Sequence, residues 1–99
     1  MGLILLEKVL TSAAAEPLSA TSLMVQSVRV QVKRANANAM EWGAGVFTAG
    51  KGHELLAPVA DTQLAGFAIE ARGQNDLDLG SLYILGTSGE GVNIIAEVF

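Results

Sequence analysis

The segment VRVQVKR (residues 28–34) decides the fold class of this chain. Val28, Val30 and Val32 alternate with polar residues in this segment. Because successive side chains of a β-strand point to opposite faces of the sheet, this period of two predicts a strand with one buried and one exposed face. The chain is therefore expected to build a sheet that covers a core on one side.

Further strands are expected on both sides of this segment. Apolar runs and alternation predict them at 3–10, 65–71, 81–85 and 92–99, with shorter candidates at 39–42, 46–48 and 54–57. Turn-forming residues recur about every 8–12 residues, a spacing typical of sandwiches and jelly rolls. We therefore expect one all-β domain over residues 1–99, an antiparallel β-sandwich of jelly-roll-like form with about eight short strands.

The connections between these strands carry three more predictions. The glycine-rich loop GTSGEG (residues 86–91) predicts a hairpin, so the last two strands are expected to be antiparallel neighbours. The apolar positions change from odd to even near Gln26, which a β-bulge or a strand break would explain, and we favour a bulge. The stretch TSAAAEPL (residues 11–18) is expected to form a loop or one helical turn, because Pro17 follows so short a run.

The composition indicates a neutral and partly apolar surface. Of the 99 residues, 51% are hydrophobic and 16% are charged, whereas about 25% are charged in typical soluble domains. A domain of this size leaves much of its surface outside the core, so some apolar surface is expected to meet a partner. A net charge of −4 with six Lys and Arg argues against nucleic-acid binding, because phosphate contacts need clustered cations.

Cysteine chemistry and membrane insertion are not expected. The chain has no cysteine, which excludes disulfides, cysteine-based zinc sites and thiol catalysis. The apolar N-terminal run is stopped by Glu7 and Lys8, which is too early for a signal peptide or a membrane span. We therefore expect no membrane partner and a protein that is soluble inside the cell that makes it.

Two stretches approach known catalytic motifs and depart from both. GVFTAGKG (residues 45–52) is close to the phosphate-loop pattern, but Gly52 replaces the hydroxyl residue and no helix is predicted to follow, which favours a glycine-rich turn. HELLA (residues 53–57) begins like a zinc-protease motif, but Ala57 replaces the second histidine and His53 is the only histidine in the chain. We predict no catalytic residue, no metal site and no cofactor.

Two further groups of residues have a structural and a functional interpretation. Asn75, Asp76 and Asp78 could gather around a calcium ion, but we favour the capping of a turn, which is the commoner role of such residues. Trp42 and Phe47 flank a glycine-rich turn, where they could stack on a sugar or anchor a protein contact. A place in the core or at its rim is the commoner fate of such aromatic residues.

The order of segments resembles small virion structural proteins of tailed bacteriophages. The resemblance spans residues 16–98 and is carried by EPLSATS (16–22), VRVQVKRANAN (28–38), WGAGVF (42–47), GHELLAPVAD (52–61) and DLDLGSLYILGTSGEGVNIIAEV (76–98). The closing element matches a D-L-x-x-L-Y-I-x-G strand, from Asp78 to Gly86. The turn of the form G-x-x-L-x-P matches at Gly52, Leu55 and Pro58, with one extra residue before the proline.

This resemblance implies a role in a virus particle. It implies a β-sandwich subunit that binds a capsid or tail as a decoration, cement or head-fibre protein. The leading expectation is a non-enzymatic protein that decorates (cements) the head, binds the major capsid protein and assembles with itself, as a trimer by preference. Such a protein would be made in the host cytoplasm and would act on the capsid surface. The alternative is a carbohydrate- or receptor-binding β-module on a tail or fibre, with Trp42 as its stacking platform.

The expected contact surface combines apolar residues from the first and last strands with the two aromatic residues. Its members are Leu3, Ile4, Leu5, Leu6, Trp42, Phe47, Ile95 and Phe99. In the last strand, Val92, Ile94, Ala96 and Val98 are expected on one face, with Ile95 and Phe99 on the other. We expect the core to cover the first of these faces and a neighbouring subunit to cover the second.

Overall fold

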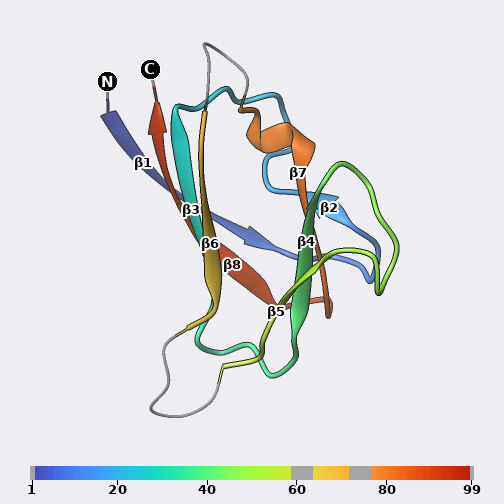
Figure 1. Cartoon of the computed structure of the whole chain (residues 1–99). Helices are drawn as coiled ribbons and strands as arrows, with labels where there is room; N and C mark the ends of the chain where they lie inside the picture. The colour runs from blue at the N-terminus through green and yellow to red at the C-terminus, as the bar shows by residue number, and fades with distance from the viewer. Residues whose placement is uncertain (1, 59–63, 72–76, 99) are drawn as a thin grey trace.

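Two four-stranded antiparallel sheets pack face to face in the computed structural model (Figure 1), which describes residues 2–58, 64–71 and 77–98. Sheet A has the strand order β1-β8-β3-β6, and its strands are β1 (Gly2–Val9), β8 (Gly91–Val98), β3 (Ser27–Val32) and β6 (Gly66–Glu70). Sheet B has the order β2-β7-β4-β5, and its strands are β2 (Glu16–Pro17), β7 (Leu82–Leu85), β4 (Met40–Ala44) and β5 (His53–Leu55). A short 3₁₀ helix, η1 (Leu79–Ser81), precedes β7.

The pairing of the strands is nested along the chain. Strand β4 pairs with β5, β3 with β6, β2 with β7 and β1 with β8, and these pairs alternate between the two sheets. Contacts of β8 with β3 and of β7 with β4 complete each sheet. A long antiparallel ribbon wound into two sheets in this way is a jelly roll, so the predicted fold class is confirmed.

Alternation along β3 places its valines in the core. Val28, Val30 and Val32 are buried, while Arg29 and Gln31 are exposed on the other face of sheet A. The same alternation holds in β8, as expected from the sequence. The buried side chains of both sheets form one core, made of Leu10, Leu18, Val25, Val28, Val30, Val32, Met40, Leu55, Leu77, Leu79, Leu82, Ile84, Val92, Ile94 and Ala96.

The last two strands are not neighbours, and the predicted hairpin is wrong. Strand β7 lies in sheet B and β8 in sheet A, so the loop between them crosses from one sheet to the other. The amide of Leu10 donates to the Glu90 carbonyl over 2.9 Å, and the amide of Gly89 donates to the Leu10 carbonyl over 2.8 Å. These bonds extend the β1·β8 ladder into the loop, so β8 pairs with β1 instead of β7.

The change of phase near Gln26 is a strand break, and the favoured bulge is wrong. Met24 forms an isolated bridge with Asp78, and the Val25 amide donates to the Leu77 carbonyl over 2.9 Å. At Gln26 the chain changes partner, because its amide donates to the Glu97 carbonyl of β8 over 2.7 Å. Elsewhere, the candidate strand at 46–48 is irregular. The loop predicted over residues 11–18 is confirmed for residues 11–14, which form bends, but it is wrong for Glu16–Pro17, which form β2 because they pair with β7.

Candidate interaction surface

The loop that resembles a phosphate-binding motif is filled by a carboxylate of its own chain. Glu41 Oε1 accepts hydrogen bonds from the backbone amides of Gly50 at 3.0 Å and Gly52 at 2.9 Å. The amide groups that would face a phosphate in such a loop therefore hold Glu41 in place. The sequence-based interpretation as a glycine-rich turn accounts for this geometry.

The carboxylate of Asp78 caps η1. Its Oδ1 accepts from the amides of Leu23 and Gly80, each at 2.8 Å, and its Oδ2 accepts from the Ser22 hydroxyl at 2.8 Å. The hydrogen bond from Leu23, followed by those from Gly80 and Ser22, lowers the pKa of Asp78. The predicted capping role is confirmed for Asp78, while Asn75 and Asp76 lie outside the described residues.

Of the two candidate aromatic anchors, Trp42 packs against the core, whereas Phe47 packs against Gly43 and Gly52. The ring of Trp42 stacks on that of Phe67 in the opposite sheet, with centroids 3.9 Å apart, and the His53 ring lies 4.9 Å away. Phe47 is half-buried, and its ring packs on the backbone of Gly52. Both aromatic residues therefore have packing roles within the sandwich.

Exposed apolar side chains gather on the outer face of sheet A. Seven large apolar side chains of the described residues are exposed; four of them lie on β1 (Leu3, Leu5, Leu6, Val9), and Ile95 lies on the adjacent β8. Leu3 is 71% exposed, Leu5 77% and Ile95 44%. Leu5 and Ile95 are direct cross-strand partners, so they lie side by side. Of the predicted interface residues, the structure brings Leu3, Leu5 and Ile95 together.

The other predicted interface residues lie elsewhere. Ile4 and Leu6 alternate with Leu3 and Leu5 along β1, and Ile4 packs against the core. Trp42 and Phe47 belong to sheet B and its loop. Phe99 lies outside the described residues. The run of apolar residues in β1 has no alternation, so its two faces could not be told apart from the sequence.

Polar residues continue the outer face across β3 and β6. In register with Leu5 and Ile95 come Arg29 of β3 and Ala68 of β6, while Glu97 and Glu70 flank Ser27 in the next row. A depression of about 370 Å³ lies here, lined by Leu3, Ser27, Val28, Arg29, Ala68, Ile69, Glu70, Ile95 and Glu97. An apolar half with a charged border is the usual composition of a protein contact surface.

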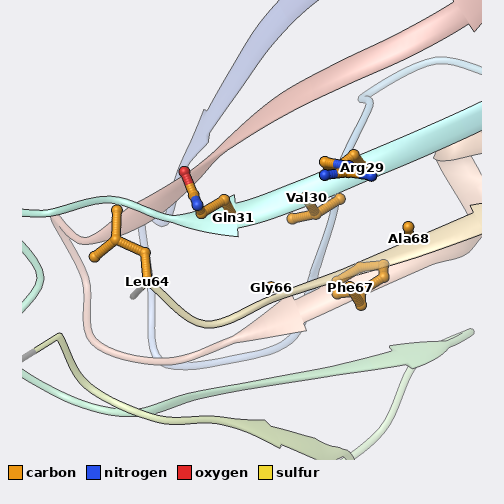
Figure 2. A pocket seen from close by; sticks show the side chains of 7 residues that line it. All are labelled: Arg29, Val30, Gln31, Leu64, Gly66, Phe67 and Ala68. Carbon is orange, nitrogen blue, oxygen red and sulfur yellow. The ribbon is translucent and has the colours of Figure 1, made fainter. Parts of the chain in front are cut away.

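A second depression continues the first along the β3·β6 pair. It has a volume of about 260 Å³ and shares Arg29 and Ala68 with the first. Figure 2 shows its lining, with Arg29, Val30 and Gln31 on β3 beside Gly66, Phe67 and Ala68 on β6. Arg29 is exposed and forms no salt bridge with the described residues. The sequence analysis did not select Arg29, because a lone exposed arginine on a strand carries no distinguishing signal.

Residues 2–58, 64–71 and 77–98 give little indication of a metal site or of a membrane-spanning helix. Over these ranges, no three His, Cys, Asp or Glu side chains gather in a way that could hold a metal ion. No helix formed by these residues is long and apolar enough to cross a membrane. Comparison of the chain with protein-family models, with curated proteins and with solved structures finds no match.

Proposed function

We propose that this protein is a non-enzymatic structural subunit that decorates and stabilises the head of a tailed bacteriophage. The observation that carries the proposal is the exposed apolar group of Leu3, Leu5 and Ile95 on the outer face of sheet A. The resemblance of residues 16–98 to small virion proteins supplies the phage context. Jelly rolls also recur among viral capsid proteins, which supports the same assignment as an analogy of fold.

The outer face of sheet A would bind the major capsid protein. Full burial of an aliphatic side chain of this size contributes about 1.5–3 kcal/mol, so three such residues supply a modest affinity for each copy. Many identical copies on a regular shell would act together, and each bridge between capsid subunits would resist internal pressure. Arg29 and the flanking glutamates would orient the subunit by matching charges on the shell.

Binding to heads that lack the protein tests this proposal. We expect the purified chain to add to such heads in a fixed ratio to the capsid protein and to raise the temperature at which they break open. Light scattering during a thermal ramp, together with quantitative gel analysis of bound protein, measures both effects. Saturating protein that neither binds the heads nor changes their stability would contradict the proposal.

A matched pair of variants distinguishes specific binding through the proposed surface from non-specific apolar adsorption. Ile95→Glu places a charge in the apolar group, whereas Val46→Glu changes a residue that is 77% exposed on a loop next to sheet B. We expect Ile95→Glu to weaken binding to heads by at least about tenfold, while Val46→Glu binds like the original chain. Equal binding by both variants would assign the contact to another face.

The alternative role, a carbohydrate- or receptor-binding module on a tail or fibre, has less support. A sugar platform needs a free aromatic face, whereas one face of the Trp42 ring is stacked on Phe67 at 3.9 Å and the His53 ring also lies 4.9 Å away. Glycan-array binding that disappears in Trp42→Ala would favour this alternative over the decoration role.

A further inference from the structure

The edge of β1 that faces away from β8 carries a row of backbone groups that no other described strand pairs with. On the other side of β8, the Gly91 carbonyl accepts from the Lys33 amide at 3.0 Å and the Glu97 carbonyl accepts from the Gln26 amide at 2.7 Å, and these two donors directly flank β3. Odd-numbered residues of β8 therefore bond toward β3. Because antiparallel bonding alternates along a strand, the even-numbered residues of β8 bond toward β1.

The register of β1 on β8 then determines which residues of β1 face outward. Even-numbered residues of β8 stand opposite even-numbered residues of β1, such as Ile4 opposite Ala96. The bond from the Leu10 amide to the Glu90 carbonyl follows the same pattern. The backbone N–H and C=O groups that point away from β8 consequently belong to Leu3, Leu5, Glu7 and Val9.

Among the described strands, β1 is also the edge with the least protection. Strand β2 has two residues and ends in Pro17, β5 has three residues, and β6 has five and ends at Glu70. Strand β1 has eight residues without proline and pairs with β8 alone among the described strands. Short length, proline and charge are the usual means by which proteins block strand pairing at a sheet edge.

The two charged residues of β1 do not block its edge either. Lys33 Nζ binds the carboxylate of Glu7, and Lys8 Nζ lies 2.9 Å from Glu16 Oε1. Both charges are thus compensated within the same chain. A strand brought alongside this edge would meet no uncompensated charge, and a second copy would bring the same compensated pairs.

We propose that the edge of β1 pairs with β1 of a second copy around a two-fold axis. A two-fold axis perpendicular to the sheet keeps the outer faces of the two copies on the same side of the joined sheet. Because directly paired residues share a face, odd-numbered residues of one β1 must stand opposite odd-numbered residues of the other. If the axis passes beside Leu6, Leu3 stands opposite Val9 of the second copy, and Leu5 stands opposite Glu7 of the second copy. In this register, all the outward-facing backbone groups of both strands form hydrogen bonds. With the axis at Leu5 instead, Val9 would have no partner among the described residues.

Side-chain packing favours the same register. Leu6 is 37% exposed, and on the axis it would meet the Leu6 of the second copy in a position where side chains approach closely. On the outer face, Leu3 would lie beside the second copy's Val9, which is itself 40% exposed. Each Glu7 would lie opposite a leucine, so no like charges stand directly opposite each other.

The resulting dimer would be closed, with one eight-stranded sheet that runs through both copies. Formation of this sheet does not depend on the proposed role on a phage head, because it uses only the edge of β1. It would nevertheless bring the apolar groups of two copies into one continuous surface. Such a surface would give the proposed capsid contact two points of attachment.

Sedimentation of the purified chain tests the dimer without any phage component. We expect a dimer for the original chain and an increase in its dissociation constant of about thirtyfold for Leu5→Pro, which removes one donor from each strand. The Leu5 amide faces away from β8, so the variant keeps the hydrogen bonds of the monomer. Leu56→Ser is the control, since it removes apolar exposure away from β1 and should not change the dimer.

Single cysteines test the register even if Leu5→Pro fails to fold. The chain has no cysteine, so Leu6→Cys should form a disulfide-linked dimer on mild oxidation, because the two positions face each other on the axis. Ile4→Cys is the matched control on the same face, and its copies would lie too far apart to join. A monomer or trimer in sedimentation, or equal cross-linking of the two cysteine variants, would overturn the proposal.

Discussion

The side-chain amide of Asn36 forms a pair of hydrogen bonds with the Gly91 backbone, as the backbone of a neighbouring strand would. Its Nδ2 donates to the Gly91 carbonyl at 2.8 Å, and its Oδ1 accepts from the Gly91 amide at 3.1 Å. Asn36 is buried, and Gly91 is the first residue of β8. A Cβ atom at Gly91 would collide with the Lys8 carbonyl. This contact sets the point where the chain enters sheet A after crossing from sheet B.

Replacing Asn36 should therefore be costly. Asn36→Ala leaves the buried Gly91 amide without its side-chain partner, while the Gly91 carbonyl keeps its hydrogen bond from the Lys33 amide. We therefore expect a loss of about 1–3 kcal/mol in the free energy of unfolding. Urea denaturation followed by circular dichroism measures this loss. Asn38→Ala, at an exposed position in the same loop, is the control. Equal stability of the two variants would contradict the role given to Asn36.

Glu16 makes the stability of the protein depend on acid pH. Its bond with Lys8, together with hydrogen bonds from Thr11 and Ser12, lowers the pKa of Glu16 from 4.5 to about 2. A carboxyl whose pKa is lower in the folded state stabilises the fold above its unfolded pKa, and this contribution is lost as pH falls toward the folded value. The relevant window runs from pH 4.5 down to about 2.

We expect Glu16→Gln to remove this pH dependence. The variant should be less stable than the original chain at pH 7, and the difference should shrink as the pH falls from 4.5 to about 2. Chemical denaturation at a series of pH values measures the difference. Glu54→Gln, at an exposed position, is the control for loss of a carboxylate. A constant difference between Glu16→Gln and the original chain across the window would be evidence against this account.

At the scale of elements, β8 is the strand on which sheet A depends. It lies between β1 and β3 and pairs with both along its length. Ile94 is 1% exposed, while the next residue, Ile95, is 44% exposed on the opposite face. Two adjacent isoleucines in one strand therefore differ in the environment of their side chains and in little else.

This pair offers a direct comparison of core and surface. We expect Ile94→Ala to lower the free energy of unfolding by about 2–5 kcal/mol, because it opens a cavity in the core. Ile95→Ala should change it by less than about 1 kcal/mol. Thermal or chemical unfolding of the two variants measures the contrast. Similar losses in both would mean that the outer face is already covered in the isolated protein.

The sequence predicted the strands better than it predicted their pairing. The alternation of Val28, Val30 and Val32 with polar residues is a local signal, so it identified β3 and its buried face. The partner of β8 depends on bonds between Leu10 and the loop at Glu90, which are far apart in the chain and leave no mark on composition. The same limit applies to Asn36, whose partner Gly91 lies 55 positions away.

At the scale of the whole molecule, the two sheets differ in what they present to a partner. Sheet B holds the irregular connections, including the loop fastened by Glu41 and the rim formed by Trp42. Sheet A presents an outer face with an apolar group beside two depressions, and β1 forms one of its edges. The candidate surface could be predicted in part from the leucines of β1 and Ile95. The arrangement of these residues beside Arg29 could not, because it requires three strands to be in register.

The nested pairing also orders events during synthesis. Partners become available from the inside outward, with β4 and β5 first and β1 and β8 last. Of these eight strands, β1 is therefore synthesised first and has to wait for β8, which is synthesised last. Throughout that wait Leu3 and Leu5 have neither β8 beside them nor a finished sheet beneath them. Slow translation of the segment that forms β8 would prolong this interval and favour premature association of nascent chains.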